Sequence, residues 1–395
     1  MLYKNIRKYL FAFENNMSAC FVRILCFLLC ILLCRIPIVK AVSTSAVSAI
    51  VIETSGNTVI YQQNAYQRLP MASTTKIMTA LCAIEAGNID RTVTVDDKAV
   101  GTEGSSIYLA KGEKLTIREL LYGLMLNSGN DAAMAIAYAV SGSVEDFAVL
   151  MNQTAQKIGA KNTNFENPSG LDGKNHYTTA YDLAIITSYA LKIPAFAEIA
   201  ATYKKTIPNG DKTYDRQLKN HNKLLNMYDG CTGVKTGFTK KCGRCLVSSA
   251  KRGNVELVAV TLNDGDDWRD HTAMLDYGFE NVTSKTIVKK GEYIATIPVK
   301  GGTQSYVKLF ASDDVNVTVK SGDEFEVQIK YDTQNEAIAP VNYGSMFGNV
   351  SIFINGKQIG CVGTQSQMTI PIEQNRGIVD IYMILLDLWI DMIYN

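Results

Sequence analysis

Ser73 and Lys76 lie three residues apart at the start of a mostly apolar segment, residues 77–86, that ends at Gly87. Good helix formers closed by a glycine predict a helix, and positions i and i+3 share one face of a helix. We therefore expect the Ser73 hydroxyl to lie beside the Lys76 amine. Serine is a poor nucleophile near neutral pH, and an amine whose pKa is lowered by burial can take its proton. The spacing predicts a serine–lysine nucleophile pair, although such a tetrad also occurs by chance.

Two more short motifs follow the tetrad along the chain. Ser128-Gly129-Asn130 lies between predicted helices at 117–126 and 132–139, and Lys235-Thr236-Gly237 begins a β-rich stretch. A second S-G-N triplet, Ser55-Gly56-Asn57, lies between two β-rich segments and predicts a hairpin turn instead. The order S-x-x-K, S-x-N, K-T-G indicates one catalytic site assembled from three parts of the chain.

This set resembles that of the penicillin-binding D-alanyl-D-alanine carboxypeptidases, serine peptidases of the bacterial cell wall, although S-G-N replaces the S-D-N element. The resemblance extends from about Thr44 to the last residues. It implies a serine-type D-Ala-D-Ala carboxypeptidase that removes the terminal D-alanine from peptidoglycan stem pentapeptides through an acyl-enzyme on Ser73 and is inhibited by β-lactams. The blocks that carry the resemblance are Pro70–Lys76, Asn127–Ala133, Asn167–Leu171 and Gly233–Thr239.

The resemblance also implies a role for each motif residue. Lys76 takes the Ser73 proton, Ser128 relays a proton to the leaving amine, and Asn130 binds the substrate amide and orients Lys76. Lys235 keeps the local field positive, and backbone N–H groups hold the oxyanion. The expected catalytic residues are Ser73, Lys76, Ser128 and Asn130; the expected substrate-binding residues are Lys235, Thr236, Gly237, Phe238 and Arg269.

For two of these residues the resemblance also implies which group of the substrate they contact. Thr236 contacts the terminal carboxylate of the peptide, and Phe238 shares the oxyanion with Ser73 through its backbone N–H. Arg269 is a candidate second cation for the carboxylate, and the alternative is a salt bridge on a helix surface. No metal or other cofactor is required.

The order of predicted elements indicates an α+β fold like that of β-lactamases and transpeptidases. Strands at 46–53 and 57–61 precede a helical block at 72–189, and strands from 233 to 262 precede a closing helix at 268–278. This order predicts an antiparallel sheet with helices on its faces. From about residue 281, strict alternation and the hairpin signal Asn355-Gly356 predict a small all-β domain. The predicted domains are a signal peptide (1–41), a catalytic domain (42–280), a β-domain (281–374) and a C-terminal helix (375–395).

The residue patterns at both ends of the chain indicate segments that interact with a membrane. Lys4, Arg7 and Lys8 precede an apolar core at 24–34, which is typical of a signal peptide. Translation from Met17 and an uncleaved anchor are the alternatives. The tail at 375–395 forms an amphipathic helix with a narrow acidic stripe. The resemblance implies that this helix lies on the outer face of the cell membrane, and docking onto a protein is the alternative.

The net charge and the cysteine count limit the binding partners and the disulfides that we expect. A formal net charge of +1 gives no indication of nucleic-acid binding. Five cysteines lie beyond the N-terminal segment, an odd number that rules out a complete intrachain disulfide framework. A lone Cys242-x-x-Cys245 is weak evidence for zinc, and we expect two buried thiols or a reversible disulfide there.

Two other functions share the motifs. A β-lactamase forms the same acyl-enzyme, but the E-x-x-x-N spacing of its deacylation loop is missing around Glu166. A non-catalytic penicillin sensor is disfavoured because the motif serines and lysines are intact. The three histidines lack a serine or aspartate at a telling spacing, so we expect His221 to be a surface or supporting residue.

Overall fold

The computed structural model describes residues 42–210, 212–322 and 324–373, together with Tyr382, Leu386 and Trp389. The predicted signal peptide at 1–41 and the predicted amphipathic helix at 375–395 fall outside the described residues, apart from those three positions. Both stay predictions.

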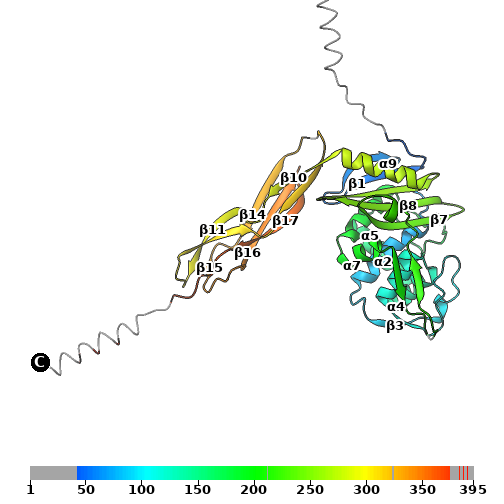
Figure 1. Cartoon of the computed structure of the whole chain (residues 1–395), viewed down its shortest axis with the longest axis horizontal. Coiled ribbons are helices and arrows are strands. Elements are labelled where there is room, and N and C mark those ends of the chain that lie inside the picture. The colour runs from blue at the N-terminus through cyan, green and yellow to red at the C-terminus, as the bar shows by residue number, and fades with distance from the viewer. Residues whose placement is uncertain are drawn as a thin grey trace, which may run out of the picture. The chain divides into compact units, whose positions relative to one another are not determined.

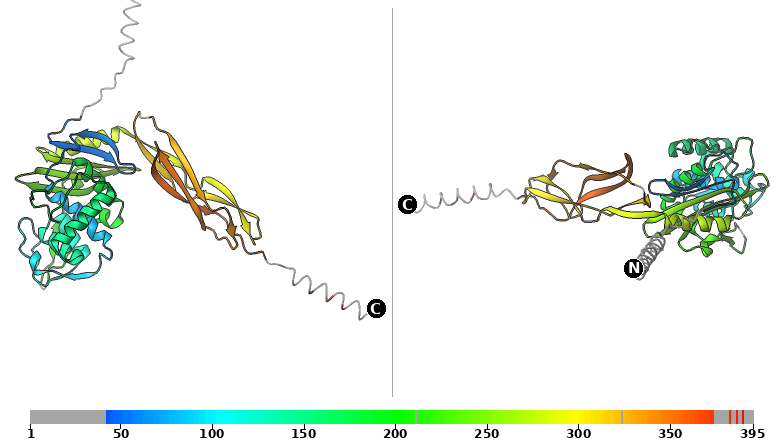
Figure 2. Two further views of the ribbon diagram at one scale, coloured as in Figure 1. Left: turned by 180° about the vertical axis from the view of Figure 1, so that it is seen from behind. Right: turned by 90° about the horizontal axis from the view of Figure 1, so that it is seen from above.

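The first part of the chain is built on a five-stranded antiparallel sheet with strand order β2-β1-β9-β8-β7. All six residues of β1 are buried, as expected for a central strand covered on both faces. Figure 1 shows α9 on one side of the sheet and α2, α5 and α7 on the other. Figure 2 shows the β1–β2 hairpin in blue at one edge of the sheet. The strands are β1 (Ser48–Glu53), β2 (Thr58–Gln63), β7 (Cys231–Thr239), β8 (Gly243–Arg252) and β9 (Val255–Asp264).

Most of the rest of this part is helical, and the apolar faces of α2 to α7 pack with the sheet in one core. Two short antiparallel pairs, β3 with β4 and β5 with β6, form separate two-stranded sheets. The helices are η1 (Ala72–Thr75), α2 (Lys76–Glu85), η2 (Asp97–Ala99), α3 (Ile117–Leu126), α4 (Asn130–Ser141), α5 (Val144–Ile158), α6 (Ala180–Leu191), α7 (Pro194–Ala201), α8 (Leu224–Met227) and α9 (Asp267–Glu280). The short strands are β3 (Thr92–Thr94), β4 (Lys114–Thr116), β5 (Lys204–Ile207) and β6 (Arg216–Lys219).

The nucleophile segment differs from the sequence prediction in one detail. Ser73 lies in the short 3₁₀ helix η1, and α2 begins only at Lys76. The Thr74 and Thr75 hydroxyls donate to the carbonyls three residues before them, and Ala72 has a left-handed φ of 47°. These local bonds tighten the turn before the helix, which the residue pattern alone did not indicate.

The second part is all-β, as predicted. A six-stranded sheet has the order β14-β16-β17-β12-β11-β15, and β10 pairs with β13. Asn355 and Gly356 form the predicted hairpin turn between β16 and β17, with φ of 48° and 78°. The strands are β10 (Val282–Val288), β11 (Tyr293–Lys300), β12 (Tyr306–Ala311), β13 (Val315–Lys320), β14 (Val327–Thr333), β15 (Ala337–Ile338), β16 (Met346–Ile354) and β17 (Lys357–Ser366).

The α+β class followed by an all-β region is confirmed, whereas the residue limits assigned to each domain stay predictions. Across the described helices, no single one is long and apolar enough to cross a bilayer. Two bent pairs, α4 with α5 and α6 with α7, reach that length and composition together.

Packing of α9 on the sheet gives the first testable prediction. A Cβ added at Gly278 would lie 2.6 Å from Leu257 Cδ1 and 3.2 Å from Val51 Cγ1. Gly278→Leu therefore forces the helix away from the strands and is expected to destabilise the protein by about 1–3 kcal/mol. Ala273→Leu, at an exposed position of the same helix, is the control. Equal melting temperatures for the two variants would contradict this packing.

Candidate active site

A cavity of ≈ 320 Å³ brings the three motifs together. Ser73 comes from η1, Ser128 from the turn between α3 and α4, and Thr236 and Gly237 from β7. The other lining residues are Ser105, His221, Phe238, Arg244, Asp267 and Trp268. Segments more than 150 residues apart in the sequence thus meet at one site, as the order of the motifs predicted.

Lys76 is fully buried and lies against the nucleophile. Its Nζ is 2.9 Å from Ser73 Oγ and 2.7 Å from Asn130 Oδ1, and it also contacts the Ser169 carbonyl. Burial lowers the pKa of Lys76 well below its ordinary value, the charge of Lys235 lowers it further, and Asp131 acts in the opposite direction. A neutral amine beside a serine hydroxyl can accept its proton.

Lys235 is a second buried amine at the same site. It is 1% exposed, and its Nζ donates to the Thr236 carbonyl at 2.9 Å. Burial lowers the pKa of Lys235 to about 7. This side chain therefore loses its proton at a lower pH than a free lysine, so the positive field that it exerts on Lys76 weakens as pH rises.

Two glycines let other backbone segments approach Ser73. A Cβ on Gly237 would lie 3.1 Å from the Thr74 nitrogen and 3.2 Å from the Ser73 nitrogen. Gly170 has φ of +85°, and a Cβ there would lie 2.0 Å from the Ala72 carbonyl oxygen. The glycines of the K-T-G motif and of the Asn167–Leu171 block are therefore required for η1 to pack between β7 and the loop before α6.

The S-G-N turn is fixed by its neighbours. The capping box of Thr116 and Glu119 starts α3, and α4 begins at Asn130. Ser128 between these helices is 5% exposed and has a left-handed φ of 58°. The Asn130 side chain donates to the Glu103 carbonyl at 2.6 Å, while its carbonyl oxygen accepts from Lys76. Asn130 therefore ties the buried amine to the loop at 101–110.

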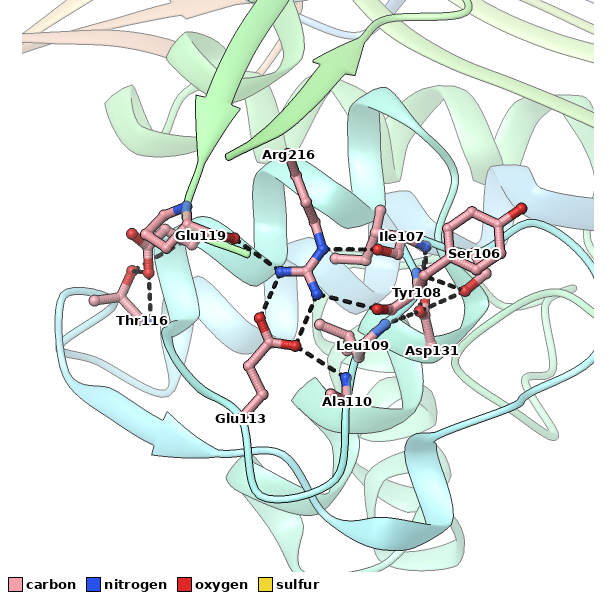
Figure 3. Close-up of polar contacts among 11 residues, drawn as sticks. Ser106, Ile107, Tyr108, Leu109, Ala110, Glu113, Thr116, Glu119, Asp131 and Arg216 are labelled. Carbon is pink, nitrogen blue, oxygen red and sulfur yellow. Dashed lines mark hydrogen bonds and ion pairs between the residues drawn. The ribbon is translucent and has the colours of Figure 1, made fainter. Parts of the chain in front are cut away.

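A buried ion pair holds that loop in place (Figure 3). All five N–H groups of the Arg216 guanidinium have acceptors: both Glu113 carboxylate oxygens and the backbone carbonyls of Ile107, Tyr108 and Pro208. Next to it, the Asp131 carboxylate accepts from the Ser106 hydroxyl and from backbone N–H groups of the same loop. The loop that supplies Ser105 to the cavity is thus anchored from two sides.

The side chains of Arg269 and Phe238 are exposed to solvent, whereas the other predicted site residues are buried or half-buried. The Arg269 side chain is 72% exposed, pairs with Asp266 at 3.2 Å and with Asp270 at 3.4 Å, and is absent from the cavity lining. Its predicted substrate contact gains no support from this position. The Phe238 ring is exposed at the rim of the cavity, so the prediction for this residue concerns its backbone N–H.

The described histidines and cysteines do not form a competing nucleophile. His271 of α9 contacts the hydroxyls of Ser248 on β8 and Thr261 on β9, and all three residues are fully buried. Exposed His221 lines the cavity, as a surface residue near the site would. Cys242 and Cys245 are buried free thiols, which was one of the two expectations for them.

Sequence reasoning missed Arg244, Asp267 and Trp268, which line the cavity, and the Glu113–Arg216 pair. The two partners of that pair are 103 residues apart and belong to no motif. Arg244 lies between Cys242 and Cys245, and the C-x-x-C pattern indicates a role for the cysteines but none for the arginine. The one available signal was the Asp267-Trp268 pair, which lies where the predicted closing helix begins at residue 268.

A half-buried serine beside a buried lysine, with two further polar motifs around the same cavity, is the arrangement of a serine hydrolase site, and comparison with known proteins identifies the family. A family described as D-alanyl-D-alanine carboxypeptidase matches residues 37–266, and one described as penicillin-binding protein 5, C-terminal domain, matches residues 283–371. The chain therefore belongs to the D-alanyl-D-alanine carboxypeptidase family of serine hydrolases.

Individual relatives agree with this assignment. The chain is 35% identical over 322 residues to D-alanyl-D-alanine carboxypeptidase DacF of Bacillus subtilis, covering 79% of this chain and 82% of the relative. It is 31% identical to DacC of Escherichia coli, covering 81% and 83%. The crystal structure of penicillin binding protein 5 from Haemophilus influenzae matches with a TM-score of 0.61 at 28% identity, covering 84% of this chain and 99% of that chain.

Burial of Lys235 predicts a pH-dependent stability cost. Its folded-state pKa of about 7 lies below its ordinary value of 10.5, so the unfolded chain binds the proton more tightly. The lysine destabilises the folded state most below pH 7 and ceases to do so above about pH 10.5. Lys235→Met is expected to melt at a higher temperature than wild type below pH 7, with the difference shrinking as pH rises to 10. A pH-independent difference would contradict the depressed pKa.

The Arg216–Glu113 pair predicts a second stability effect. Arg216→Met leaves the buried Glu113 carboxylate unpaired and is expected to cost about 3–5 kcal/mol in the free energy of unfolding. Arg118→Met removes a pair with Asp90 at the surface and is expected to cost less than about 1 kcal/mol. Denaturant unfolding of both variants checks this, and a small effect at Arg216 would show that the pair does not anchor the loop.

Proposed function

We propose that the chain removes the terminal D-alanine from peptidoglycan stem pentapeptides through an acyl-enzyme on Ser73. The observation that carries the proposal is the contact between the Ser73 hydroxyl and the fully buried Lys76 amine, 2.9 Å apart. A desolvated amine is a base at the pH at which a free lysine is protonated. The family supplies the substrate class.

The first chemical step forms the acyl-enzyme. Ser73 Oγ attacks the carbonyl carbon of the penultimate D-alanine while its proton passes to Lys76. The tetrahedral oxyanion is held by the backbone N–H groups of Ser73 and Phe238. The C–N bond then breaks, and the departing amine of the terminal D-alanine receives a proton through Ser128, with Lys235 keeping the field positive.

The second step returns the free enzyme. Water attacks the ester carbonyl, Lys76 again serves as base, and Ser73 leaves with a proton. Asn130 keeps Lys76 oriented through its carbonyl oxygen, 2.7 Å away, and binds the amide of the peptide. A β-lactam contains a strained amide that Ser73 attacks in the same way, and its amine cannot diffuse away, so hydrolysis is slow.

The location of this activity is also a proposal. Its peptidoglycan substrate lies outside the cytoplasm, which fits the signal peptide predicted at 1–41. We place the enzyme on the outer face of the cell membrane, held there by the amphipathic helix predicted at 375–395. A variant truncated after residue 374 lacks this predicted helix. It is expected in the soluble fraction after cell lysis, whereas the full chain is expected in the membrane fraction.

Intact-protein mass spectrometry after benzylpenicillin tests the proposed reaction. Wild type is expected to gain the mass of one penicillin, whereas Ser73→Ala gains none. Ser55→Ala, in the other S-G-N triplet, is the matched control for Ser128→Ala. The first is expected to acylate normally and the second about 100-fold more slowly or worse, the low end of the range for a group that transfers a proton.

Release of D-alanine from diacetyl-L-Lys-D-Ala-D-Ala completes the test. Ser73-dependent release establishes the carboxypeptidase. Rapid loss of the adduct with turnover of penicillin indicates a β-lactamase, an adduct without D-alanine release indicates a sensor, and the absence of an adduct contradicts the acyl-enzyme.

A further inference from the structure

A second groove borders the active-site cavity along two segments of the chain. In the loop before β4, Ser105 lines the cavity and the next residue, Ser106, lines the groove. In the turn between α3 and α4, Ser128 lines the cavity and the preceding residue, Asn127, lines the groove. The groove has a volume of ≈ 540 Å³, and the proposed reaction uses none of its lining residues. A ligand in the groove would therefore lie beside a substrate in the cavity.

Two exposed tyrosines line this groove. Tyr108 is 79% exposed and Tyr214 is 63% exposed. The backbone of Tyr108 is nevertheless fixed, because its N–H donates to the Ser106 hydroxyl at 2.8 Å and its carbonyl accepts from Arg216 Nη2 at 3.0 Å (Figure 3). Tyr108 also has a left-handed φ of 58°, which is unfavourable for a bulky side chain. An aromatic ring on such a fixed backbone offers a large surface for packing against a ligand.

A buried amide lines the groove as well. Asn209 is 6% exposed, and among the described residues its Oδ1 has no hydrogen-bond partner. Buried acceptors are nearly always paired in folded proteins, because an unpaired one is destabilising. The Asn209 oxygen is therefore a candidate acceptor for an N–H or hydroxyl group of a ligand. Asn127 and Gln217 add two more amide side chains to the lining.

The charges around the groove cancel one another. Lys212 and Asp215 carry opposite charges, and the Arg216 guanidinium is fully engaged by Glu113 and by backbone carbonyls. A strongly charged ligand would therefore gain little from this lining. Tyrosine rings together with neutral amides suit a sugar, which has C–H groups on its ring faces and hydroxyl groups at its edges.

The proposed substrate has such a sugar near the bond that is cleaved. In peptidoglycan the amino end of the stem peptide forms an amide with an N-acetylated sugar, so the acid group of that sugar carries no charge. Four residues separate the sugar from the bond to the terminal D-alanine, and four extended residues span at most about 14 Å. The groove begins one residue away from the cavity on both shared segments, so a glycan-linked peptide can occupy the two together.

We propose that this groove binds the N-acetylated sugar to which the stem peptide is attached. The rings of Tyr108 and Tyr214 pack against the sugar, and the Asn209 amide forms a hydrogen bond with it. The inference rests on the proposed function and deepens it, because it makes the stem peptide joined to its glycan a better substrate than the peptide alone.

The test compares D-alanine release from two substrates that differ only in the sugar. One is the N-acetylated pentapeptide L-Ala-γ-D-Glu-L-Lys-D-Ala-D-Ala, and the other is this pentapeptide linked to the disaccharide of N-acetylglucosamine and N-acetylmuramic acid. For wild type, kcat/KM is expected to be about tenfold higher for the disaccharide substrate, the effect of one hydrogen bond together with aromatic packing. In the double variant Tyr108→Ala, Tyr214→Ala this preference is expected to fall to near one, with activity on the acetylated pentapeptide unchanged.

The chain provides a matched control in Tyr66, which is 57% exposed and is absent from the lining of the groove. Its ring packs on Tyr181, with the two ring centroids 5.1 Å apart. Tyr66→Ala is expected to keep the full preference for the disaccharide substrate.

Asn209→Ala separates sugar binding from a structural role. The variant is expected to lower the preference for the disaccharide substrate while its melting temperature stays the same or rises, because the substitution removes an unpaired buried acceptor. A lower melting temperature with an unchanged preference would contradict the hydrogen bond assigned to Asn209.

The outcomes separate this inference from the proposed function. If wild type releases no D-alanine from either substrate, the proposed function is wrong. If wild type cleaves both substrates equally well, or if the folded double variant keeps the preference, the inference is wrong. An equal loss of activity on both substrates in the double variant would show that the groove binds the peptide, which also contradicts the inference. Tyr214→Ala alone serves in case the double variant does not fold, and thermal unfolding verifies the folding of each variant.

Discussion

The candidate site depends on one unfavourable placement: an amine removed from water and held against a hydroxyl. Lys76 has no exposed surface, and its Nζ contacts Ser73, Asn130 and the Ser169 carbonyl. Burial of a cation costs free energy, and the chain lowers that cost by favouring the neutral amine. This neutral form is the one able to accept a proton from serine. The same desolvation thus reduces stability and supplies the base, and the surrounding core must offset the cost.

The rest of the site is organised so that this contact persists. Gly237 and Gly170 allow β7 and a loop to approach the nucleophile turn more closely than a side chain would permit. Asn130 connects the amine to the loop at 101–110, and Arg216 donates to two carbonyls of that loop, those of Ile107 and Tyr108. Arg244 on β8 adds a cation at the edge of the cavity, held by α9. Sheet, helices and loops therefore each constrain one side of a small reaction volume.

The sequence correctly predicted helices, strands and turns whose formation depends on residues close together in the chain. The apolar periodicity of 117–126, the K-T-G strand and the Asn355-Gly356 turn were all found, because each is set by neighbouring residues. The 3₁₀ turn at Ser73 was missed because it depends on hydroxyl-to-carbonyl bonds that helix propensity does not describe. Glu113–Arg216 and Arg244–Asp267 were missed because partners from distant segments meet only once the chain has folded. A single sequence contains no local signal for such pairs.

The central claim, a neutral Lys76 beside Ser73, is tested most directly by NMR of protein labelled with ¹³C at lysine Cε. The Lys76 signal is assigned by its loss in Lys76→Met and followed from pH 5 to pH 11. The account predicts a midpoint well below the ordinary value of 10.5, because burial disfavours the charged amine. A Lys76 signal that titrates near 10.5, together with the surface lysines, would contradict the account, because Ser73 would then have no base.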